Sequence, residues 1–197
     1  MSGLDPETLR SALDPHPPAL DERGAAVAAV FRHEGGRAEL LFIQRATFDG
    51  DPWSGQMAFP GGRIELHDSD RFAAAERETS EELSLDLMPD HRLGTVGTVE
   101  GGRHARRSIV VSGHGYWLEG DRPVLRPNRE VAAALWVPVD VLLDRDRYID
   151  YRYPTRGDSA TFPGIQLDDP RQVIWGLTLR MLANLFDRLE RPFLIRP

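Results

Sequence analysis

The sequence predicts an α/β protein in which helices cover a β-sheet on both faces. Several short apolar runs are typical of strands, and two longer stretches are typical of helices, one ending near Glu82 and one near the C-terminus. Strands with helices before and after them pack as a sheet covered on both sides. The length of 197 residues favours one domain, and the sequence contains no internal repeat.

Residues 24–197 are expected to form this domain, and an N-terminal segment of different character precedes it. Residues 1–23 are rich in Pro and Asp, which predicts an arm or a short helix plus linker. Two apolar runs, Ala25–Arg32 and Ala38–Gln44, flank residues 34–37 (EGGR) and predict a hairpin whose turn is longer than two residues. Further strands are expected at Gln56–Phe59, Gly94–Glu100, Ser108–Trp117, Ala132–Val137, Tyr148–Tyr153 and Ala160–Ile165, the last two as a second hairpin.

Helices are expected at three places after the first hairpin. Asp70 or Ser69 can cap a helix that runs to about Glu82, because short polar side chains accept hydrogen bonds from the first free N–H groups. A short helix is expected at Val139–Leu143. The stretch Gln172–Arg191 carries apolar residues at helical spacing and predicts a long amphipathic helix.

The most informative segment is the first of these helices, which carries a dense acidic cluster. Four glutamates and an arginine fall within seven residues, namely Glu76, Arg77, Glu78, Glu81 and Glu82. Residues three and four apart are neighbours on a helix, so Glu78, Glu81 and Glu82 are expected to converge on one face. Each like-charge pair costs roughly 0.2–0.5 kcal/mol. A divalent cation would more than offset this cost, and oxygen ligands at this density suit Mg²⁺ or Mn²⁺.

The surroundings of the cluster favour a site over an ordinary solvated helix face. A double glycine, Gly61-Gly62, precedes the helix in a loop and lets the backbone approach a ligand closely. The opposite helix face, from Phe72 to Ala75 and at Leu83, is small and apolar. Such a face can lie on a sheet while the acidic residues point into a cleft.

The segment from Gly62 to Glu82 resembles the signature of the Nudix hydrolases. The glycine, the first acidic residue and the R-E-x-x-E-E run of that signature correspond to Gly62, Asp68, Arg77, Glu78, Glu81 and Glu82. One extra residue before Arg77 is similar to an insertion in the branch that resembles coenzyme A pyrophosphatases. The flanks LLFIQRA, GDPWSGQMAFPGG, EVAAALWVPVDVLL and VIWGLTLRML resemble that branch too, so the likeness runs from about Ala25 onward. The resemblance implies an α/β/α sandwich with a mixed central sheet, the Nudix fold.

Roles for the residues of the cluster follow from this chemistry. Glu78 and Glu82 are expected to be the principal metal ligands. Glu81 is expected to act as a further ligand or as the group that accepts a proton from water. The Gly62 carbonyl is a further expected ligand, and Arg77 is expected to orient a glutamate by a charge-assisted hydrogen bond.

Other candidate residues lie outside the cluster. Arg103, Arg106 and Arg107 fall in one loop-like segment and suit bidentate phosphate binding, with a solvated turn as the alternative. Arg45, at the end of a strand, could reach the same phosphate or form a structural salt bridge. Glu130 precedes a strand at a position that resembles one where some relatives place a distal catalytic or metal-binding glutamate.

Composition excludes several classes of protein. Without cysteine there can be neither a disulfide framework nor a thiolate metal site. No apolar run approaches the ~18 residues that span a bilayer, and residues 1–20 lack the basic start and apolar core of a signal peptide. The net charge of −7 argues against a nucleic-acid binder, and composition agrees with a cytoplasmic domain. The family resemblance implies a small-molecule nucleotide as substrate. The N-terminal arm or the C-terminal helix could build a homodimer.

The expected reaction is metal-dependent hydrolysis of a nucleotide pyrophosphate by water attack on phosphorus. Coenzyme A or a derivative is the leading substrate by resemblance. The stretch Phe48–Trp53 lacks the basic or histidine-bearing pattern usual in that branch, so NADH, ADP-ribose and related nucleotides stay open. A non-catalytic nucleotide sensor on the same scaffold is the alternative class, although the intact acidic cluster favours an enzyme.

Overall fold

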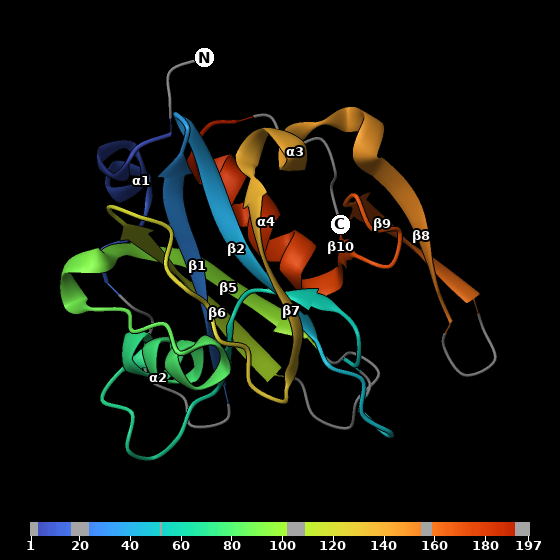
Figure 1. Ribbon diagram of the computed structural model, residues 1–197, viewed down its shortest axis with the longest axis horizontal. Coiled ribbons are helices and arrows are strands. Elements are labelled where there is room, and N and C mark those ends of the chain that lie inside the picture. The colour runs from blue at the N-terminus through green and yellow to red at the C-terminus, as the bar shows by residue number, and fades with distance from the viewer. Residues whose placement is uncertain (1–3, 17–23, 52, 102–108, 155–158, 192–197) are drawn as a thin grey trace.

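The computed structural model describes residues 4–16, 24–51, 53–101, 109–154 and 159–191 (Figure 1). Within these residues the helices are α1 (Pro6–Ala12), α2 (Arg71–Leu83), α3 (Val139–Leu143) and α4 (Gly176–Arg188). The strands are β1 (Ala25–Glu34), β2 (Arg37–Arg45), β3 (Met57–Ala58), β4 (Gly61–Arg63), β5 (Arg92–Gly101), β6 (Ile109–Leu118), β7 (Val131–Pro138), β8 (Tyr148–Pro154), β9 (Ser159–Gln166) and β10 (Val173–Trp175). Single turns of 3₁₀-helix lie at Pro89–His91 and Arg145–Arg147.

The larger sheet is mixed and forms the centre of the molecule. Its strands follow the order β3-β2-β1-β6-β5, with β4 also paired to β1 and β7 also paired to β2. β1 and β6 run parallel, whereas the other paired strands of this sheet are antiparallel. The mixed central sheet implied by the family resemblance is therefore confirmed.

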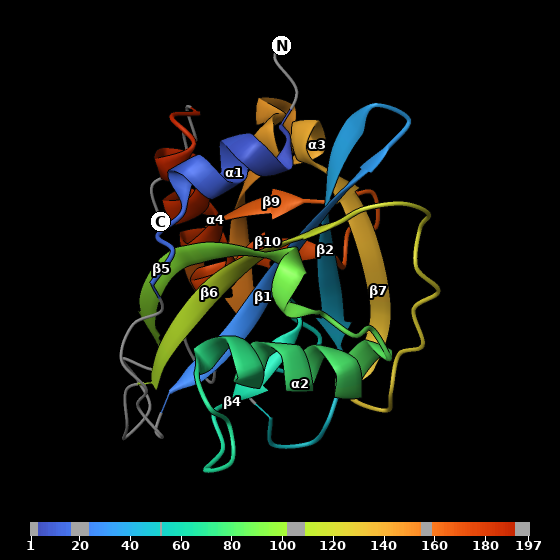
Figure 2. The same ribbon diagram turned by 90° about the vertical axis from the view of Figure 1, so that its left-hand side faces the viewer.

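Side chains of the central strands alternate between two hydrophobic clusters, one on each face of the sheet. In β2, Leu40 and Phe42 belong to the cluster that α4 covers, while Leu41 and Ile43 belong to the cluster that α2 covers. This alternation follows from the two-residue period of a strand. Figures 1 and 2 show α2 and α4 on different sides of the sheet. The expected sandwich of helix, sheet and helix is confirmed.

The first hairpin has a tighter turn than the sequence analysis expected. Glu34 pairs with Arg37, so only Gly35 and Gly36 form the turn. Their φ angles of 56° and 79° are left-handed, as two-residue hairpin turns of this kind require, and glycine adopts them without steric cost. The expectation of a longer turn was wrong because the strands continue through Glu34 and Arg37.

The C-terminal segment divides into a strand and a helix, where the sequence analysis expected one long helix over Gln172–Arg191. Val173–Trp175 pairs with β9 as β10, and α4 begins only at Gly176. The β-branched and aromatic side chains of this short run favour the strand once β9 is available as a partner. β10, β9 and β8 form a second sheet that was not expected, and its β8–β9 hairpin confirms the predicted one.

The described part of the N-terminal segment packs against the domain. The side chain of Asp5 caps α1 by accepting a hydrogen bond from a backbone N–H of the first turn. Three leucines of this segment are buried in the cluster that α4 covers: Leu4, Leu9 and Leu13. Residues 4–16 thus share the core of the domain, whereas residues 1–3 and 17–23 of the expected arm and linker lie outside the described residues.

Candidate active site

Helix α2 carries the acidic cluster and lies on the central sheet through its apolar face. The helix begins after Asp70, whose side chain accepts a hydrogen bond from Ala73 N at 2.7 Å, so the cap expected at Asp70 or Ser69 is confirmed. The apolar residues of the helix are buried against the sheet: Phe72, Ala74, Ala75 and Leu83. The remaining faces of α2 carry Arg77 and the glutamates.

The two glycines before α2 form the short strand β4, where the sequence analysis expected a loop. β4 pairs antiparallel with the beginning of β1. The N–H of Gly61 donates to Glu82 Oε2 at 2.9 Å. A side chain at Gly62 would overlap the carboxylate of Glu78. The backbone of β4 therefore lies directly against two of the candidate metal ligands.

Replacing Gly62 by Ala is expected to weaken divalent-cation binding with little loss of stability. The new methyl group would displace the carboxylate of Glu78, whose flexible end can move without disturbing the backbone. Because Glu78 is a candidate ligand, we expect Mn²⁺ affinity to fall by about 10–100-fold, as it does when the support of a metal ligand is lost. Isothermal titration calorimetry measures the affinity, and thermal unfolding measures the stability.

Gly113→Ala provides a matched control for this substitution. Its methyl group would press against the flexible side chain of Met181 on α4 and would touch no candidate ligand. This variant should bind Mn²⁺ as the wild type does. Wild-type affinity in the Gly62→Ala variant would contradict the placement of Glu78 in a cation site.

Glu82 is almost fully buried, with 4% of its surface exposed. Burial raises the pKa of Glu82 to about 8, although the hydrogen bond from Gly61 acts in the opposite direction. The charges of Glu78 and Glu130 also raise this pKa, whereas the charge of Arg45 lowers it. Backbone hydrogen bonds connect the same segments. Asn128 N donates to the carbonyl of Glu82, and Ala46 N donates to the carbonyl of Glu130, both at 2.8 Å. Residues from α2, β2 and the start of β7 are thus brought together.

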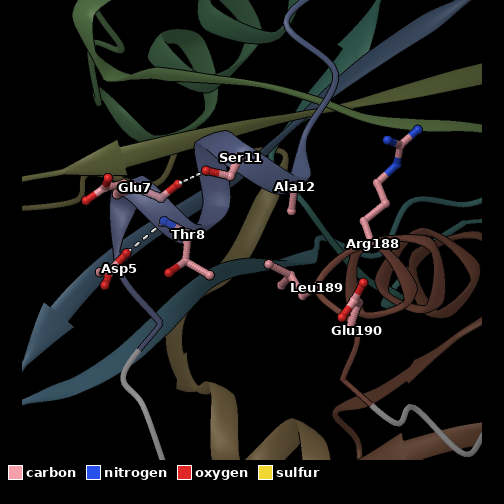
Figure 3. A pocket seen from close by; sticks show the side chains of 8 residues that line it. All are labelled: Asp5, Glu7, Thr8, Ser11, Ala12, Arg188, Leu189 and Glu190. Carbon is pink, nitrogen blue, oxygen red and sulfur yellow. Dashed lines mark hydrogen bonds between the residues drawn. The ribbon is translucent and has the colours of Figure 1, made fainter.

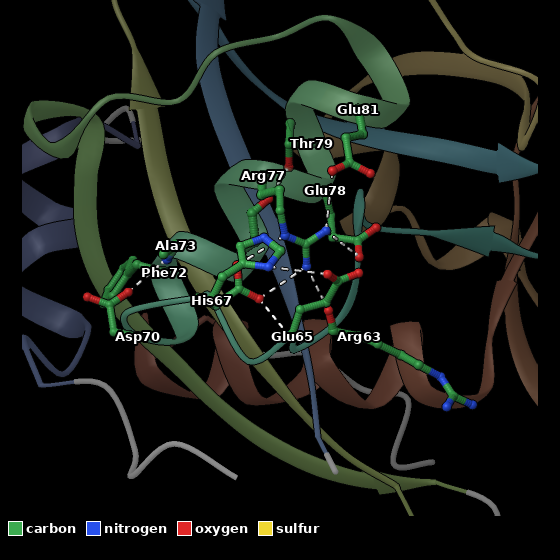
Figure 4. A network of polar contacts seen from close by, with 12 residues as sticks. Arg63, Glu65, His67, Asp70, Phe72, Ala73, Arg77, Glu78, Thr79 and Glu81 are labelled. Carbon is green, nitrogen blue, oxygen red and sulfur yellow. Dashed lines mark hydrogen bonds and ion pairs between the residues drawn. The ribbon is translucent and has the colours of Figure 1, made fainter. Parts of the chain in front are cut away.

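Arg77 is the centre of a polar network beside this cluster (Figure 4). Its Nε and Nη2 atoms donate to the two carboxylate oxygens of Asp68 at 3.0 and 3.1 Å. Its Nη1 atom donates to Glu78 at 3.0 Å and to Glu81 at 3.4 Å. Its Nη2 atom also donates to the carbonyl oxygen of Arg63 at 2.9 Å. Arg77 therefore holds two candidate ligands and ties them to the segment between β4 and α2.

Glu81 and Glu82 point in different directions, contrary to the expected convergence of all three glutamates. Glu81 has 60% of its side chain exposed, whereas Glu82 is buried. Consecutive residues of a helix are rotated by about 100° from each other, which separates these two side chains. Within the part of the chain that the structure describes, no three His, Cys, Asp or Glu residues form a group that could hold a metal ion. Glu78 and Glu82 lie against the β4 backbone, whereas Glu81 lies apart from Glu82 and is joined to Glu78 through Arg77.

Of the four candidate substrate-binding arginines, the structure describes Arg45. Arg45 Nη2 forms an ion pair with Asp51 at 3.3 Å, and the charge of Arg45 lowers the pKa of Glu82. Arg45 Nε is buried and has no hydrogen-bond partner among the described residues, so this side chain has capacity for a further contact. Three arginines expected to bind phosphate lie outside the described residues: Arg103, Arg106 and Arg107.

The family of the chain follows from a comparison with known proteins. The NUDIX domain family model matches residues 22–156, more than half of the chain. This chain belongs to the Nudix family. Human mitochondrial coenzyme A diphosphatase NUDT8 is 32% identical over 157 residues, which are 78% of this chain and 64% of that protein. Chloroplastic Nudix hydrolase 22 of Arabidopsis thaliana is 28% identical over 167 residues, or 83% of this chain.

The chain spans about half the length of the Arabidopsis relative, 54%. Among solved structures, a MutT/nudix family protein from Enterococcus faecalis superposes with a TM-score of 0.61 at 16% sequence identity. The match covers 90% of this chain and 65% of that one. This likeness shows the fold, so the Nudix fold expected from the signature is confirmed. Residues 22–156 of the chain are therefore called the Nudix domain below.

The donor set of this Nudix domain suits a hard divalent cation. Glu78 and Glu82 offer carboxylate oxygens beside the β4 backbone, where Gly61 N donates to Glu82. The Gly62 carbonyl stays a predicted ligand. Oxygen ligands of this kind are those that Mg²⁺ and Mn²⁺ prefer. Burial raises the pKa of Glu78 as well as that of Glu82. A cation would favour the ionised forms that burial disfavours.

One ion pair of the Nudix domain had no signal in the sequence. The sequence offers Glu76 no partner at helical spacing, yet Arg92 Nε and Nη2 donate to its two carboxylate oxygens at 2.6 and 2.7 Å. Arg92 also lies over the ring of Phe72, with its guanidinium carbon 4.9 Å from the ring centroid. Arg92 begins β5, and only the packing of this strand beside α2 brings the pair together.

A separate open hollow of about 450 Å³ lies between α1 and the end of α4 (Figure 3). Residues of α1 line it on one side, and Arg188, Leu189 and Glu190 line it on the other. None of the candidate site residues of the Nudix domain lines it. The acidic cluster lies on α2, away from this hollow, as Figure 2 shows.

Proposed function

We propose that this Nudix domain hydrolyses a pyrophosphate bond in a nucleotide, with Mg²⁺ or Mn²⁺ as cofactor and coenzyme A as the leading substrate. The observation that best supports this proposal is the meeting of Glu78 and Glu82 with the β4 backbone, close to Arg45. Two carboxylates suit a cation, and a guanidinium suits a phosphate oxygen.

In the proposed reaction a water oxygen attacks one phosphorus atom, and the bridging P–O bond on the opposite side of that phosphorus breaks. The leaving phosphate takes the electron pair of the broken bond. The proton released by the water passes to a carboxylate, for which we propose Glu81 or Glu130. A bound cation supplies positive charge that offsets the charge of the pyrophosphate.

The remaining residues bind and orient in this proposal. Glu78, Glu82 and the carbonyl of Gly62 hold the cation, with Glu81 as a further ligand if it is not the proton acceptor. Arg77 holds Glu78 and Glu81 in place through its hydrogen bonds. The arginines proposed to contact the substrate phosphates are Arg45, Arg103, Arg106 and Arg107.

Coenzyme A leads among the substrates because a human relative is named as a coenzyme A diphosphatase. The motif flanks that resemble this branch point in the same direction. The stretch Phe48–Trp53 carries no basic residue, so NADH and ADP-ribose are the next candidates. The alternative function is that of a non-catalytic nucleotide sensor.

Mass spectrometry of products tests this proposal. The protein is incubated with Mg²⁺ or Mn²⁺ and with coenzyme A, NADH, ADP-ribose or a dinucleoside polyphosphate, in water enriched in ¹⁸O. Coenzyme A is expected to yield 4′-phosphopantetheine and 3′,5′-ADP, with ¹⁸O in a phosphate group of one product. If only another nucleotide is cleaved, the proposed substrate is wrong and the proposed reaction holds. If a nucleotide binds and none is cleaved, the sensor is favoured.

Cellular location and assembly also belong to the proposal. No helix within the described residues combines the length and the apolar character that crossing a membrane requires. The human and Arabidopsis relatives are named as mitochondrial and chloroplastic proteins. For this chain we propose a cytoplasmic enzyme that acts on a small-molecule nucleotide, with a homodimer as a state to be tested by light scattering.

A further inference from the structure

The last turn of α2 is covered by the segment that leads from β6 to β7. Carbonyl groups at the C-terminal end of a helix need partners from outside the helix. The carbonyl of Leu83 accepts a hydrogen bond from Arg126 N, and that of Glu82 accepts one from Asn128 N, both at 2.8 Å. The carbonyl of Glu81 accepts a hydrogen bond from Asn128 Nδ2 at 3.0 Å. Asn128 thus contacts the backbone of two residues of the acidic cluster.

The other end of the same side-chain amide holds Glu130. Asn128 Oδ1 accepts a hydrogen bond from Glu130 N at 2.8 Å, in the local turn that Asn forms with the backbone two residues further on. The carbonyl of Glu130 accepts a hydrogen bond from Ala46 N at 2.8 Å, directly after Arg45. Asn128 therefore joins the end of α2 to the start of β7, and the backbone of Glu130 joins β7 to the end of β2.

The chemistry of this link requires an amide. Nδ2 faces a carbonyl oxygen and Oδ1 faces an N–H group, so the orientation of the Asn128 amide is determined by its partners. Aspartate would place an oxygen against the carbonyl of Glu81 and would add a negative charge beside the cluster. Serine could accept from Glu130 N more weakly, but its short side chain lacks the NH₂ group that bonds Glu81.

We propose that Asn128 is a positioning residue that sets the place of Glu130 relative to Glu82 across the candidate site. This inference rests on the proposed function, because it assumes that Glu130 takes part in the reaction. Glu130 directly precedes β7 and is far from α2 in the sequence, yet its charge raises the pKa of both Glu78 and Glu82. Asn128 itself touches no reacting atom, and its effect passes through Glu130.

A double-mutant cycle between Asn128 and Glu130 tests the proposal. Asn128→Ala is expected to lower kcat by about 10-fold or more, in the range seen when the support of an active-site ligand is lost. In a Glu130→Gln background the same substitution is expected to change kcat by less than about two-fold, because residues that act as a unit are not additive. Asn128→Ser, which keeps an acceptor for Glu130 N, should fall between Asn128→Ala and the wild type.

Ser80→Ala is the matched control, because it also removes a side-chain hydrogen bond near the end of α2. Ser80 Oγ donates to Asp86 at 2.7 Å and contacts neither Glu81 nor Glu130. This variant should keep wild-type kcat. The exchange rate of the Glu130 amide proton, measured by NMR, should rise in Asn128→Ala and stay unchanged in Ser80→Ala.

Equal effects of Asn128→Ala in the wild-type and Glu130→Gln backgrounds would overturn the proposal, as would unchanged protection of the Glu130 amide. These outcomes differ from failure of the proposed function, which would show as no turnover of any nucleotide by the wild type. In that case the exchange rate of the Glu130 amide proton remains the readout. Equal exchange in Asn128→Ala and the wild type would then overturn the role of Asn128.

Discussion

Replacing Glu82 by Gln is expected to lower kcat by at least about 100-fold for every nucleotide that the wild-type enzyme hydrolyses, more than the 10–100-fold typical for losing the support of a ligand. Glutamine keeps the size of the side chain, and its amide oxygen can still accept the hydrogen bond from Gly61 N. The expected loss therefore reflects the missing carboxylate charge and not a collapse of the β4 contact. Steady-state kinetics at saturating Mn²⁺ and substrate measure the effect.

Glu65→Gln is a suitable control for this experiment. Glu65 lies between β4 and α2, has 55% of its side chain exposed, and its carboxylate contacts the exposed His67. The substitution removes the same charge close to the site without touching Glu82. It should leave kcat within about two-fold of the wild type, because Glu65 is not a candidate ligand. Its stability should change by less than about 0.5 kcal/mol, as is usual for surface substitutions. If Glu82→Gln retained more than a tenth of the wild-type kcat, Glu82 could not be a principal ligand.

The metal-free protein is expected to lose stability as the pH rises from about 5 to about 8. The pKa of Glu82 rises from an ordinary value of 4.5 to about 8 in the folded protein because the side chain is buried. Between these values the folded state binds more protons than the unfolded state, so the free energy of unfolding falls with pH. Below 4.5 both states are protonated and the penalty is absent, and above 8 the penalty is complete. Burial raises the pKa of Glu78 too, which adds in the same direction.

Thermal unfolding between pH 5 and 8.5, with a chelator or with Mn²⁺, measures this dependence. The Tm of the metal-free wild type should fall with pH, by about 2–4 °C for each kcal/mol lost in a protein of this size. Mn²⁺ should flatten the curve because a bound cation favours the ionised carboxylates and stabilises only the folded state. Glu82→Gln should flatten it without metal and should raise the Tm at pH 8. Parallel curves for the wild type and Glu82→Gln would contradict the assignment.

Much of the fold was predictable because it depends on local patterns. The cap at Asp70, the extent of α2, the short helix α3 and the β8–β9 hairpin all agree with the periodicity and capping signals of their own segments. The errors occurred where two local signals compete. Val173–Trp175 fits a helical spacing, but its side chains favour a strand once β9 is beside it.

Some features of the candidate site likewise follow from local spacing, and others depend on packing. The spacing of Arg77, Glu78 and Glu82 follows from helical geometry, so the sequence suffices to place them on one helix with their charges close together. Helical spacing does not reveal burial, and it placed Glu81 with Glu78 and Glu82. Glu81 is exposed and Glu82 is buried, because β4 covers only one side of the helix end.

The family signature, the class of fold, the helix that carries the acids and a set of carboxylates that suits a hard cation were all predictable from the sequence. Each of these depends on residues within a few positions of one another, whose geometry the backbone of a helix or strand dictates. Tertiary packing was needed to show that Arg92 pairs with Glu76, that Asn128 links α2 to Glu130, and that Arg45 pairs with Val131. These contacts join segments far apart in the chain, and strand pairing and packing select them because local spacing carries no information about them.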